Sequence, residues 1–408
     1  MFRVTILVVL IGIALYINQV VVPATPPLFM PTPTPTHSPE SFVNQAQDFF
    51  KAGKLDRAIE AYQSAIDSDP ANAANYIELA RLQIYTRKYT DAITNAQNAQ
   101  LKNPENPQAL AIEGWALGFT GKYGQAEEKI RQSLALDPKN ALTHAYYAEI
   151  LINQGKFELQ DKAAQESRAA LDLDQNLMET HRARGIVLYN TQNLKEAEDE
   201  FKAAINAYKY LSDLYFYLGV TYKADQKYDL AQEALLQAYT LDPKNTDSLI
   251  ELARSFFADG KYAQAAQYAE EAVRVDPSNP RLHGYLGSSY YKNKEYDKAI
   301  TELALAVRGG TTTAGTAVQG LPLAYDNGII TYYTHYGLSL AYTGRCAEAV
   351  PIFQAMLNGV ANDENAVYNA EFGLGICLYT PTPTSKVPQG TPQPGGAEKP
   401  AVTATPKP

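Results

Sequence analysis

The stretch GKYAQAAQYAEEAVRVDP, residues 260–277, decides the fold, because near copies of it recur along the chain. Residues 53–70 read GKLDRAIEAYQSAIDSDP, and residues 121–138 read GKYGQAEEKIRQSLALDP. A period of mostly 34 residues predicts stacked helical hairpins, each too small to bury its own apolar face alone. One alanine marks the same position in every copy: Ala58, Ala92, Ala126, Ala163, Ala197, Ala231, Ala265, Ala299 and Ala349.

A second small residue precedes most of these alanines by twelve positions, where the first helix of a hairpin would approach the second. A bulkier side chain at such a contact costs roughly 1–3 kcal/mol in overpacking. Prolines such as Pro70 and Pro277 then end the second helix, because proline cannot continue it. The small residues are Ala46, Ala80, Gly114, Ala148, Gly185, Gly219, Ala253, Gly287 and Gly337.

With these residues, the segment over 41–378 resembles the tetratricopeptide repeat family. The resemblance implies an all-α fold, a right-handed superhelix (α-solenoid) of about nine helical hairpins plus a carboxy-terminal cap helix. Eight repeats are expected over 41–308, an inserted loop over 309–329, and the ninth repeat with the cap helix over 330–378. The inserted loop is expected either to cover one end of the binding groove or to serve only as a connection.

The amino-terminal segment predicts a membrane anchor. Residues 4–22 carry no charge and are nearly long enough, as a helix, to span a hydrocarbon core of about 30 Å. Because Arg3 precedes this segment, the expected orientation of residues 1–22 places the amino terminus in the cytoplasm and the repeats outside it, in a bacterial envelope. A cleaved secretory signal is the alternative. Residues 23–40 would form a Pro/Thr-rich spacer and residues 379–408 a disordered Thr/Pro-rich tail.

Two cysteines bear on the carboxy-terminal end of the array. Cys346 begins the second helix of the ninth repeat, and Cys377 lies in the cap helix. Stacked hairpins would bring them toward the same end of neighbouring helices, so a disulfide is one interpretation. Two buried free thiols are the other.

The sequence offers no catalytic, cofactor or metal site. No two of the five histidines have ligand spacing on one helix, and no phosphate-binding loop or nucleophile elbow occurs. A net charge of −9 argues against nucleic acid as a partner. We therefore expect a protein that is not an enzyme, binds no small-molecule substrate and has no cofactor.

The resemblance implies partner proteins as ligands, gripped as extended peptide segments in a concave groove that the first helices line. Basic and aromatic side chains alternate along the positions that the family's register assigns to this groove. The expected function is a non-catalytic, membrane-anchored scaffold. The alternatives are a structural surface-layer or filament component, or an accessory subunit of an envelope assembly or glycosylation complex. The groove residues are Phe50, Lys51, Arg81, Tyr85, Trp115, Phe119, Arg182, Tyr189, Phe216, Lys223, Arg254, Phe257, Tyr291 and Lys292.

Overall fold

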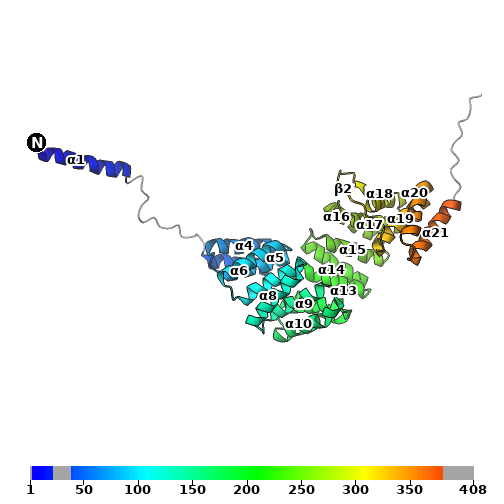
Figure 1. Ribbon diagram of the computed structural model, residues 1–408, viewed down its shortest axis with the longest axis horizontal. Coiled ribbons are helices and arrows are strands. Elements are labelled where there is room, and N and C mark those ends of the chain that lie inside the picture. The colour runs from blue at the N-terminus through cyan, green and yellow to red at the C-terminus, as the bar shows by residue number, and fades with distance from the viewer. Residues whose placement is uncertain (1, 22–37, 380–408) are drawn as a thin grey trace, which may run out of the picture. The chain divides into compact units, whose positions relative to one another are not determined.

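The computed structural model describes residues 2–21 and 38–379 of the chain (Figure 1). Within these residues the fold is helical, apart from one pair of two-residue strands. The chain divides into two compact units, Met1–Ser248 and Leu249–Pro408, which we call the first unit and the second unit. The predicted spacer up to residue 37 and the predicted tail from residue 380 lie outside the described residues.

The predicted membrane anchor is wrong. Helix α1 spans Phe2–Tyr16, 15 residues, and a π-helical segment, Ile17–Val21, follows it. At about 1.5 Å per residue α1 is about 22 Å long, which falls short of a hydrocarbon core of about 30 Å. Among residues 2–21 and 38–379, no helix combines the length and the apolar character needed to cross a bilayer. The predicted single-pass topology, with the repeats outside the cytoplasm, therefore loses its basis.

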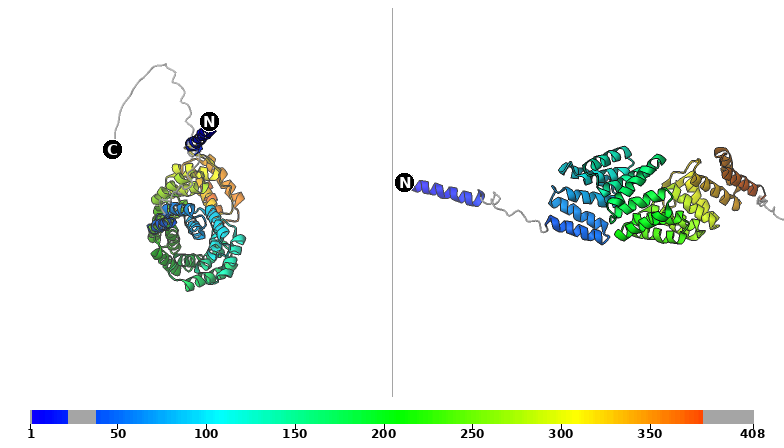
Figure 2. Two further views of the ribbon diagram at one scale, coloured as in Figure 1. Left: turned by 90° about the vertical axis from the view of Figure 1, so that its left-hand side faces the viewer. Right: turned by 90° about the horizontal axis from the view of Figure 1, so that it is seen from below.

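The described residues from 38 to 379 form nine helical hairpins and one final helix, as the sequence period predicts. Successive hairpins of the first unit pack against each other in chain order, from blue through cyan in the right-hand view of Figure 2. The helices of the first unit are α3 (Pro39–Lys51), α4 (Leu55–Ser68), α5 (Ala73–Tyr85), α6 (Tyr89–Lys102), α7 (Pro107–Phe119), α8 (Tyr123–Leu136), α9 (Ala141–Asn153), the 3-10 turn η2 (Phe157–Leu159), α10 (Gln160–Leu173), α11 (Met178–Asn190), α12 (Leu194–Ala207), α13 (Ser212–Ala224) and α14 (Tyr228–Leu241).

The second unit continues the same pattern and ends in the predicted cap helix. Helix α15 contributes its residues from Leu249 onward to this unit. The elements are α15 (Thr246–Ala258), α16 (Tyr262–Val275), α17 (Pro280–Lys292), α18 (Tyr296–Arg308), β1 (Gly310–Thr311), β2 (Ala317–Val318), α19 (Asn327–Tyr342), α20 (Cys346–Gly359) and α21 (Glu364–Tyr379).

The small residues lie where the two helices of a hairpin meet. A Cβ atom added to Gly219 would lie 2.5 Å from Cγ of Leu235, and one added to Gly185 would lie 2.7 Å from the ring of Phe201. The marker alanines, such as Ala58, are fully buried. Close helix approach therefore explains the period of small residues, as the sequence predicts.

Each hairpin among the described residues turns through one residue with positive φ. Glycine adopts this left-handed conformation without a steric penalty, whereas a residue with a Cβ atom pays roughly 1–2 kcal/mol. Five hairpins use glycine and four do not. The turn residues are Gly53, Arg87, Gly121, Gly155, Gln192, Gln226, Gly260, Lys294 and Gly344.

Replacing Gln226 with glycine is therefore expected to stabilise the first unit. Relief of the left-handed strain at φ 58° exceeds the extra chain entropy of glycine, so the free energy of unfolding should rise by about 0.5–1 kcal/mol. Urea denaturation followed by circular dichroism measures this change. The same substitution at Gln237, inside α14, is the control and should destabilise by about 1 kcal/mol. A loss of stability in Gln226→Gly would contradict the account.

Three histidines on first helices each make a pair of hydrogen bonds, one to a glutamate on the second helix of the hairpin and one to a carbonyl of the preceding loop. We call this pair of bonds a clasp. In His144, Nδ1–H donates to Glu166 at 2.6 Å and Nε2–H donates to the Pro138 carbonyl at 3.1 Å. His181 and His283 make the same pair of bonds in their own hairpins. A carboxylate and a carbonyl both accept hydrogen bonds, so each ring makes both bonds together when both of its nitrogens carry a proton, that is, as the cationic imidazole.

The clasp raises the pKa of each histidine above its usual value. For His144 and His181 the hydrogen bond to glutamate is the main cause. For His283, burial acts most strongly and disfavours the charge, but the bonds to Glu302 and to the Pro277 carbonyl outweigh it. Tyr76 occupies the equivalent position in the second hairpin, and its hydroxyl donates to the Pro70 carbonyl at 3.3 Å without any charge.

This chemistry predicts how stability depends on pH. A raised folded-state pKa contributes stability that is complete below about pH 6.5 and is lost as pH rises through the folded pKa. The native chain should therefore lose on the order of 1 kcal/mol per clasp between pH 6.5 and pH 9. Replacing His144, His181 and His283 with tyrosine, the residue that Tyr76 places at the same position, should flatten that decline. Urea midpoints at a series of pH values measure the effect, and an equal decline in both proteins would contradict it.

The pKa of His335 shifts in the opposite direction, and His335 is not replaced in the triple tyrosine variant. Burial, with the nearby Lys292 charge, lowers the pKa of His335 to about 3. Its contribution to stability is complete above about pH 6.5 and is lost only as pH falls toward 3. It therefore does not interfere with the range from pH 6.5 to pH 9.

The insertion after the eighth hairpin is anchored to the second unit. Strands β1 and β2 pair antiparallel, with Gly310 opposite Val318. The Leu321 N–H then donates to the Ala306 carbonyl at 2.8 Å, and the Tyr333 hydroxyl donates to the Leu321 carbonyl at 3.1 Å. Helix α19 begins at Asn327, three residues before the predicted start of the ninth repeat.

Cys346 and Cys377 form a disulfide bond that joins the start of α20 to α21, with their Cα atoms 5.4 Å apart. The sequence left a disulfide and two free thiols both open, and the structure contains the disulfide. Helix α21 also packs against α19 and α20, so the end of the array is held both by packing and by a covalent link.

Candidate functional site

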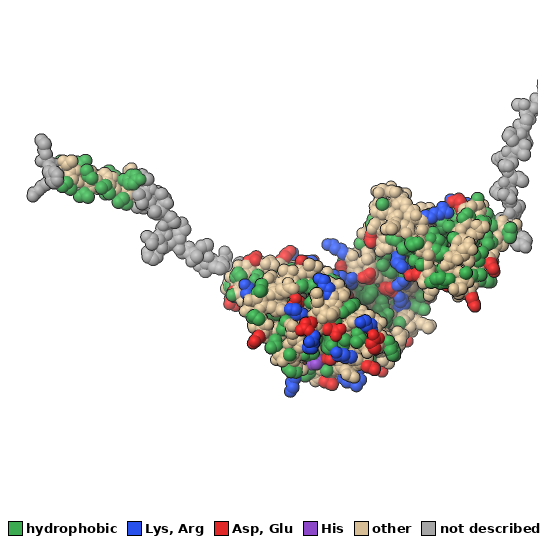
Figure 3. Space-filling view, viewed as in Figure 1, with side chains coloured by type: hydrophobic (Ala, Val, Ile, Leu, Met, Phe, Trp, Pro, Cys, Tyr) green, Lys and Arg blue, Asp and Glu red, His purple; other side chains and the backbone are tan. Residues whose placement is uncertain are grey.

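The predicted groove residues have different surroundings in the two units. In the first unit, side chains of several first helices contact one another. In the second unit, a cavity opens on the corresponding face. Figure 3 shows basic and acidic side chains interspersed on the visible face of the first unit, without a large patch of one sign.

A buried network in the first unit centres on Arg182. Arg182 is 2% exposed and Trp115 is 1% exposed, so the prediction that these two side chains face a partner is wrong. The Trp115 Nε1–H donates to Glu149 at 2.7 Å, and the Arg182 guanidinium donates to the other oxygen of Glu149 and, at 2.6 Å, to Asp213. These four residues come from four successive first helices, α7, α9, α11 and α13.

Burial and pairing set the electrostatics of this network. Burial raises the pKa of Glu149, while Arg182 and the Trp115 hydrogen bond oppose that rise. The pKa of Arg182 lies well above its usual value because Glu149 and Asp213 outweigh the effect of burial, which alone would lower it. The Arg182 guanidinium also lies 5.6 Å from the centre of the Trp115 ring. It is thus engaged by its own chain rather than presented to a ligand carboxylate.

A second set of contacts bridges the same face between more distant hairpins. Arg81 on α5 pairs with Glu78 of its own helix and, at 3.2 Å, with Glu179 on α11. The Tyr85 hydroxyl donates to the same Glu179 oxygen at 2.5 Å. Glu179 is buried, so the second and fifth hairpins are joined through a shared buried carboxylate.

The first hairpin also contacts the end of the fifth. The ring of Phe50 stacks on Tyr208 at 4.3 Å, and the Tyr208 hydroxyl donates to the Phe50 carbonyl at 2.9 Å. A Cβ atom on Gly53 would lie 2.5 Å from the ring of Tyr210, so the approach is close. Together with the network of Arg182, these contacts fill much of the first-helix face of the first unit with its own side chains.

The remaining predicted residues of the first unit are partly accessible. Lys51 is exposed at the end of α3, and Phe119 stacks on Tyr89 at 4.8 Å. The other three are half-buried: Tyr189, Phe216 and Lys223.

A cavity of about 620 Å³ lies beside Gly53 and Tyr85. Its lining contains both signs of charge, since Asp56 pairs with Lys88 at 3.3 Å there. Basic side chains outnumber acidic ones in the lining: Lys54, Arg57, Lys88 and Lys244 against Asp56 and Asp242.

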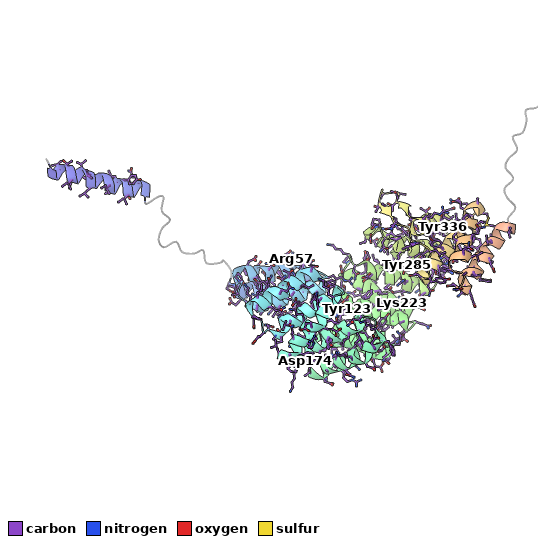
Figure 4. All side chains as sticks on the ribbon, in the orientation of Figure 1. Arg57, Tyr123, Asp174, Lys223, Tyr285 and Tyr336 are labelled. Atoms are coloured by element: carbon purple, nitrogen blue, oxygen red, sulfur yellow. A yellow bond between two sulfur atoms is a disulfide. The ribbon has the colours of Figure 1, made fainter. Side chains whose placement is uncertain are left out.

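The second unit has a cavity of about 310 Å³ on the face formed by its first helices, which we call the second-unit cavity. Two predicted groove residues, Arg254 and Phe257 on α15, line it. Helices α17 and α19 supply the other walls, and Figure 4 labels Tyr285 on α17. The full lining is Ala253, Arg254, Phe257, Tyr285, Ser288, Ser289, Asn327, Gly328, Thr331 and Tyr332.

Aromatic rings and hydroxyl groups make up the chemistry of this cavity. Tyr285 and Tyr332 meet edge to face at 5.8 Å, and the Arg254 guanidinium lies 4.5 Å from the centre of the Tyr285 ring. Within the described residues, Ser288 Oγ and the Tyr332 hydroxyl are buried without a hydrogen bond of ordinary geometry. Burial raises the pKa of Tyr332 to about 12, against the opposing effects of the nearby Arg254 and Arg281 cations. Tyr332 is therefore a neutral hydroxyl at physiological pH.

The last two predicted groove residues belong to a different cluster of the second unit. The ring of Tyr291 stacks on His335 at 4.2 Å, and Tyr342 lies 6.5 Å from Tyr291. Exposed Lys292 lies 5.9 Å from the centre of the Tyr291 ring. Neither Tyr291 nor Lys292 lines the second-unit cavity.

Sequence reasoning missed the residues that decide which face is open. Glu149 interrupts the apolar run AYYAEILI over 145–152, and a carboxylate in such a run signals a buried ion pair. Ser288 and Tyr332 had no comparable signal, because a serine and one tyrosine among 29 look like ordinary helix residues.

Comparisons with known families match three separate segments to the family described as tetratricopeptide repeat, at residues 49–115, 212–245 and 250–313.

No group of three or more His, Cys, Asp or Glu side chains suited to a metal ion occurs within residues 2–21 and 38–379.

Curated relatives match parts of the chain. Tetratricopeptide repeat protein 28 of Mus musculus is 32% identical over 98 residues, 24% of this chain and 4% of that protein. A DnaJ homolog subfamily C member 7 homolog of Schizosaccharomyces pombe is 26% identical over 183 residues, 43% of this chain and 38% of that protein. The chain thus spans only a minor part of the length of these two relatives.

Solved structures give similar partial matches. One is described as the APC/C hetero-tetramer Cut9–Hcn1, with a TM-score of 0.49 and 16% identity, covering 60% of this chain and 48% of that one. Another concerns pilF of Pseudomonas aeruginosa, with a TM-score of 0.43 and 22% identity, covering 50% of this chain and 90% of that one.

The three matched segments lie in both units, and the hairpins between them share the same small residues and left-handed turns. The chain therefore belongs to the tetratricopeptide repeat family.

Proposed function

We propose that this protein is a scaffold that binds an extended segment of a partner protein on the first-helix face of its second unit. A tetratricopeptide repeat fold suits a protein–protein interaction scaffold. The observation that carries the proposal is the second-unit cavity, in which two buried hydroxyl groups, on Ser288 and Tyr332, lack a well-formed hydrogen bond to any described residue. A buried polar group without a partner costs about 1–3 kcal/mol, which a ligand that supplies the missing bond recovers.

The contrast with the first unit supports this choice of face. There, Arg182 and Trp115 are buried against Glu149, and Phe50 stacks on Tyr208. A partner segment would have to break those contacts before it could bind. In the second unit, Arg254 is exposed and Phe257 is half-buried at the wall of a cavity.

The lining also suggests what a segment would present. The rings of Phe257 and Tyr285 suit an apolar side chain, since aromatic walls and a few placed polar groups are typical of ligand pockets of this size. The Arg254 guanidinium donates to Glu251 at 2.7 Å and to the Tyr285 hydroxyl, and it still has further N–H groups to offer a carbonyl or carboxylate oxygen of the ligand.

Phage-displayed peptides selected on the purified full-length chain test the proposal. The selected peptides should lose at least tenfold in affinity when Thr331→Trp fills the cavity or when Phe257→Ala removes its wall. Phe216→Ala, which changes a half-buried ring on a first helix of the first unit, is the matched control and should alter affinity less than twofold. Fluorescence anisotropy measures the binding. Peptides that ignore both cavity variants would refute the proposal.

A further inference from the structure

We propose that the second-unit cavity binds a proline-rich segment, and that its occupant in the free protein is the chain's own Thr/Pro-rich stretch, residues 380–408. This inference rests on the proposed function, since it uses the same cavity. It adds the chemical class of the ligand and a competitor built into the chain.

The hydrogen-bonding groups of the cavity favour a ligand rich in acceptors. Ser288 and Tyr332 offer buried hydroxyl groups that lack well-formed hydrogen bonds within the described part of the chain, and Arg254 offers a guanidinium, which can only donate. A proline residue has no N–H, so a proline-rich segment presents carbonyl oxygens with few competing donors. Such a segment satisfies the hydroxyl groups without burying an unpaired donor of its own.

The walls of the cavity favour the same class of ligand. Phe257, Tyr285 and Tyr332 supply three rings from three successive first helices. Aromatic grooves recognise proline-rich segments because the extended polyproline helix is preformed and loses little entropy on binding. The edge-to-face arrangement of Tyr285 and Tyr332 sets their ring planes at 86°, so two walls of different orientation can contact successive prolyl rings.

The chain itself carries a segment of this class directly after its last described helix in the sequence. Directly after α21 the sequence reads TPTPTSKVPQGTPQPGGAEKPAVTATPKP. Helix α21 packs against α19, which supplies Thr331 and Tyr332 to the cavity. The 29 residues after Tyr379 can span up to about 90 Å at about 3.1 Å per residue, several times the length of the 16-residue helix α21.

Because residues 380–408 are covalently joined to the helices that form the cavity, even a weak affinity is enough for them to occupy it. A segment joined by a short linker has an effective concentration on the order of millimolar at its site. A proline-rich segment that binds with a dissociation constant of about 100 μM would then occupy the cavity most of the time. A partner segment must displace it, so the stretch at 380–408 would act as an intramolecular competitor that excludes weak ligands.

Photo-crosslinking of the purified full-length chain tests where residues 380–408 lie. With benzoylphenylalanine in place of Phe257, which keeps an aromatic ring at the wall of the cavity, peptides from 380–408 of the same chain should carry the crosslink, with a yield independent of protein concentration. The same probe in place of Gln264, exposed on the second helix α16, is the control and should give at most a tenth of that yield. Absence of the adduct, or adducts only between two copies, would overturn the proposal.

A competition experiment separates this inference from the proposed function. A fluorescent peptide with the sequence of residues 380–392, TPTPTSKVPQGTP, is titrated into the native chain and into a chain in which Pro381, Pro383, Pro388 and Pro392 are serine. We expect about tenfold tighter binding to the substituted chain, and loss of binding in both when Thr331→Trp is added. Circular dichroism verifies that all variants stay folded.

Each other outcome has a distinct meaning. Equal affinity for the native and substituted chains overturns occupancy by residues 380–408, whereas the proposed function stands if the phage-selected peptides still depend on Phe257. Binding to neither chain overturns the proline-rich class. If neither the fluorescent peptide nor the phage-selected peptides bind at the cavity, the proposed function is rejected as well.

Discussion

Replacing Arg182 with alanine is expected to destabilise the first unit by about 3–5 kcal/mol, because it leaves Glu149 buried with an uncompensated charge. Trp115 donates to the same carboxylate and is the single tryptophan of the chain, so its fluorescence reports on this network directly. In guanidinium denaturation of Arg182→Ala, the Trp115 fluorescence, which reports on the first unit, should change at a lower denaturant concentration than in the native chain. The circular dichroism signal, which sums the helices of both units, should keep a later phase from the second unit.

The control for Arg182→Ala is an arginine whose ion pair faces solvent. Arg131 pairs with Glu128 on α8, and its side chain is 74% exposed. Arg131→Ala should therefore change the unfolding free energy by less than about 1 kcal/mol. The double variant Arg182→Leu with Glu149→Leu should be more stable than Arg182→Ala alone, because no buried charge remains unpaired. A loss below about 1 kcal/mol in Arg182→Ala would contradict the buried network.

Breaking the Cys346–Cys377 bridge is expected to destabilise the carboxy-terminal end of the array by about 3–4 kcal/mol. This magnitude follows from the chain entropy of a loop closed over a separation of 31 residues. Hydrogen exchange in α20 and α21 should speed up strongly in Cys346→Ser, because α21, the last described helix, packs mainly against α19 and α20 and loses its covalent link to α20. Exchange in α3 to α6 should not change.

Three variants of the bridge give an internal control. Cys346→Ser, Cys377→Ser and the double variant remove the same bond, so their effects should agree within about 0.5 kcal/mol. Alkylation with and without reductant, followed by mass spectrometry, measures whether the bond is present in the purified protein. Free thiols in the unreduced native protein would contradict the bridge.

Local sequence pattern was enough to predict the hairpins. Small residues such as Gly219, which cannot accommodate a Cβ atom beside Leu235, recur because each hairpin repeats the same close contact. The same register placed Cys346 and Cys377 toward the same end of neighbouring helices, but it left a disulfide and two free thiols both open. The amino-terminal segment misled the prediction because residues 4–22 are uncharged and mostly apolar, whereas the α-helix ends at Tyr16.

No local sequence pattern could predict which of the groove side chains are accessible to a ligand. The register correctly assigned Trp115 and Arg182 to first helices, but burial of these side chains depends on Glu149 and Asp213, 31–34 residues away in neighbouring hairpins. The contact between Phe50 and Tyr208 joins residues 158 positions apart. Such contacts depend on the twist between successive hairpins, which is the sum of many small packing differences and has no signature in any one repeat.

Hydroxyl-radical footprinting by mass spectrometry, with and without a phage-selected peptide, tests the central claim that the second unit, and not the face around Trp115, receives the partner. The test uses the chain in which Pro381, Pro383, Pro388 and Pro392 are serine, so that residues 380–408 do not compete for the cavity. We predict that Phe257 and Tyr285 of this chain are oxidised without the peptide and protected by it, while Trp115 stays unmodified in both states. Oxidation of Trp115 in the free chain that disappears when the peptide binds, with Phe257 and Tyr285 unaffected, would contradict the account.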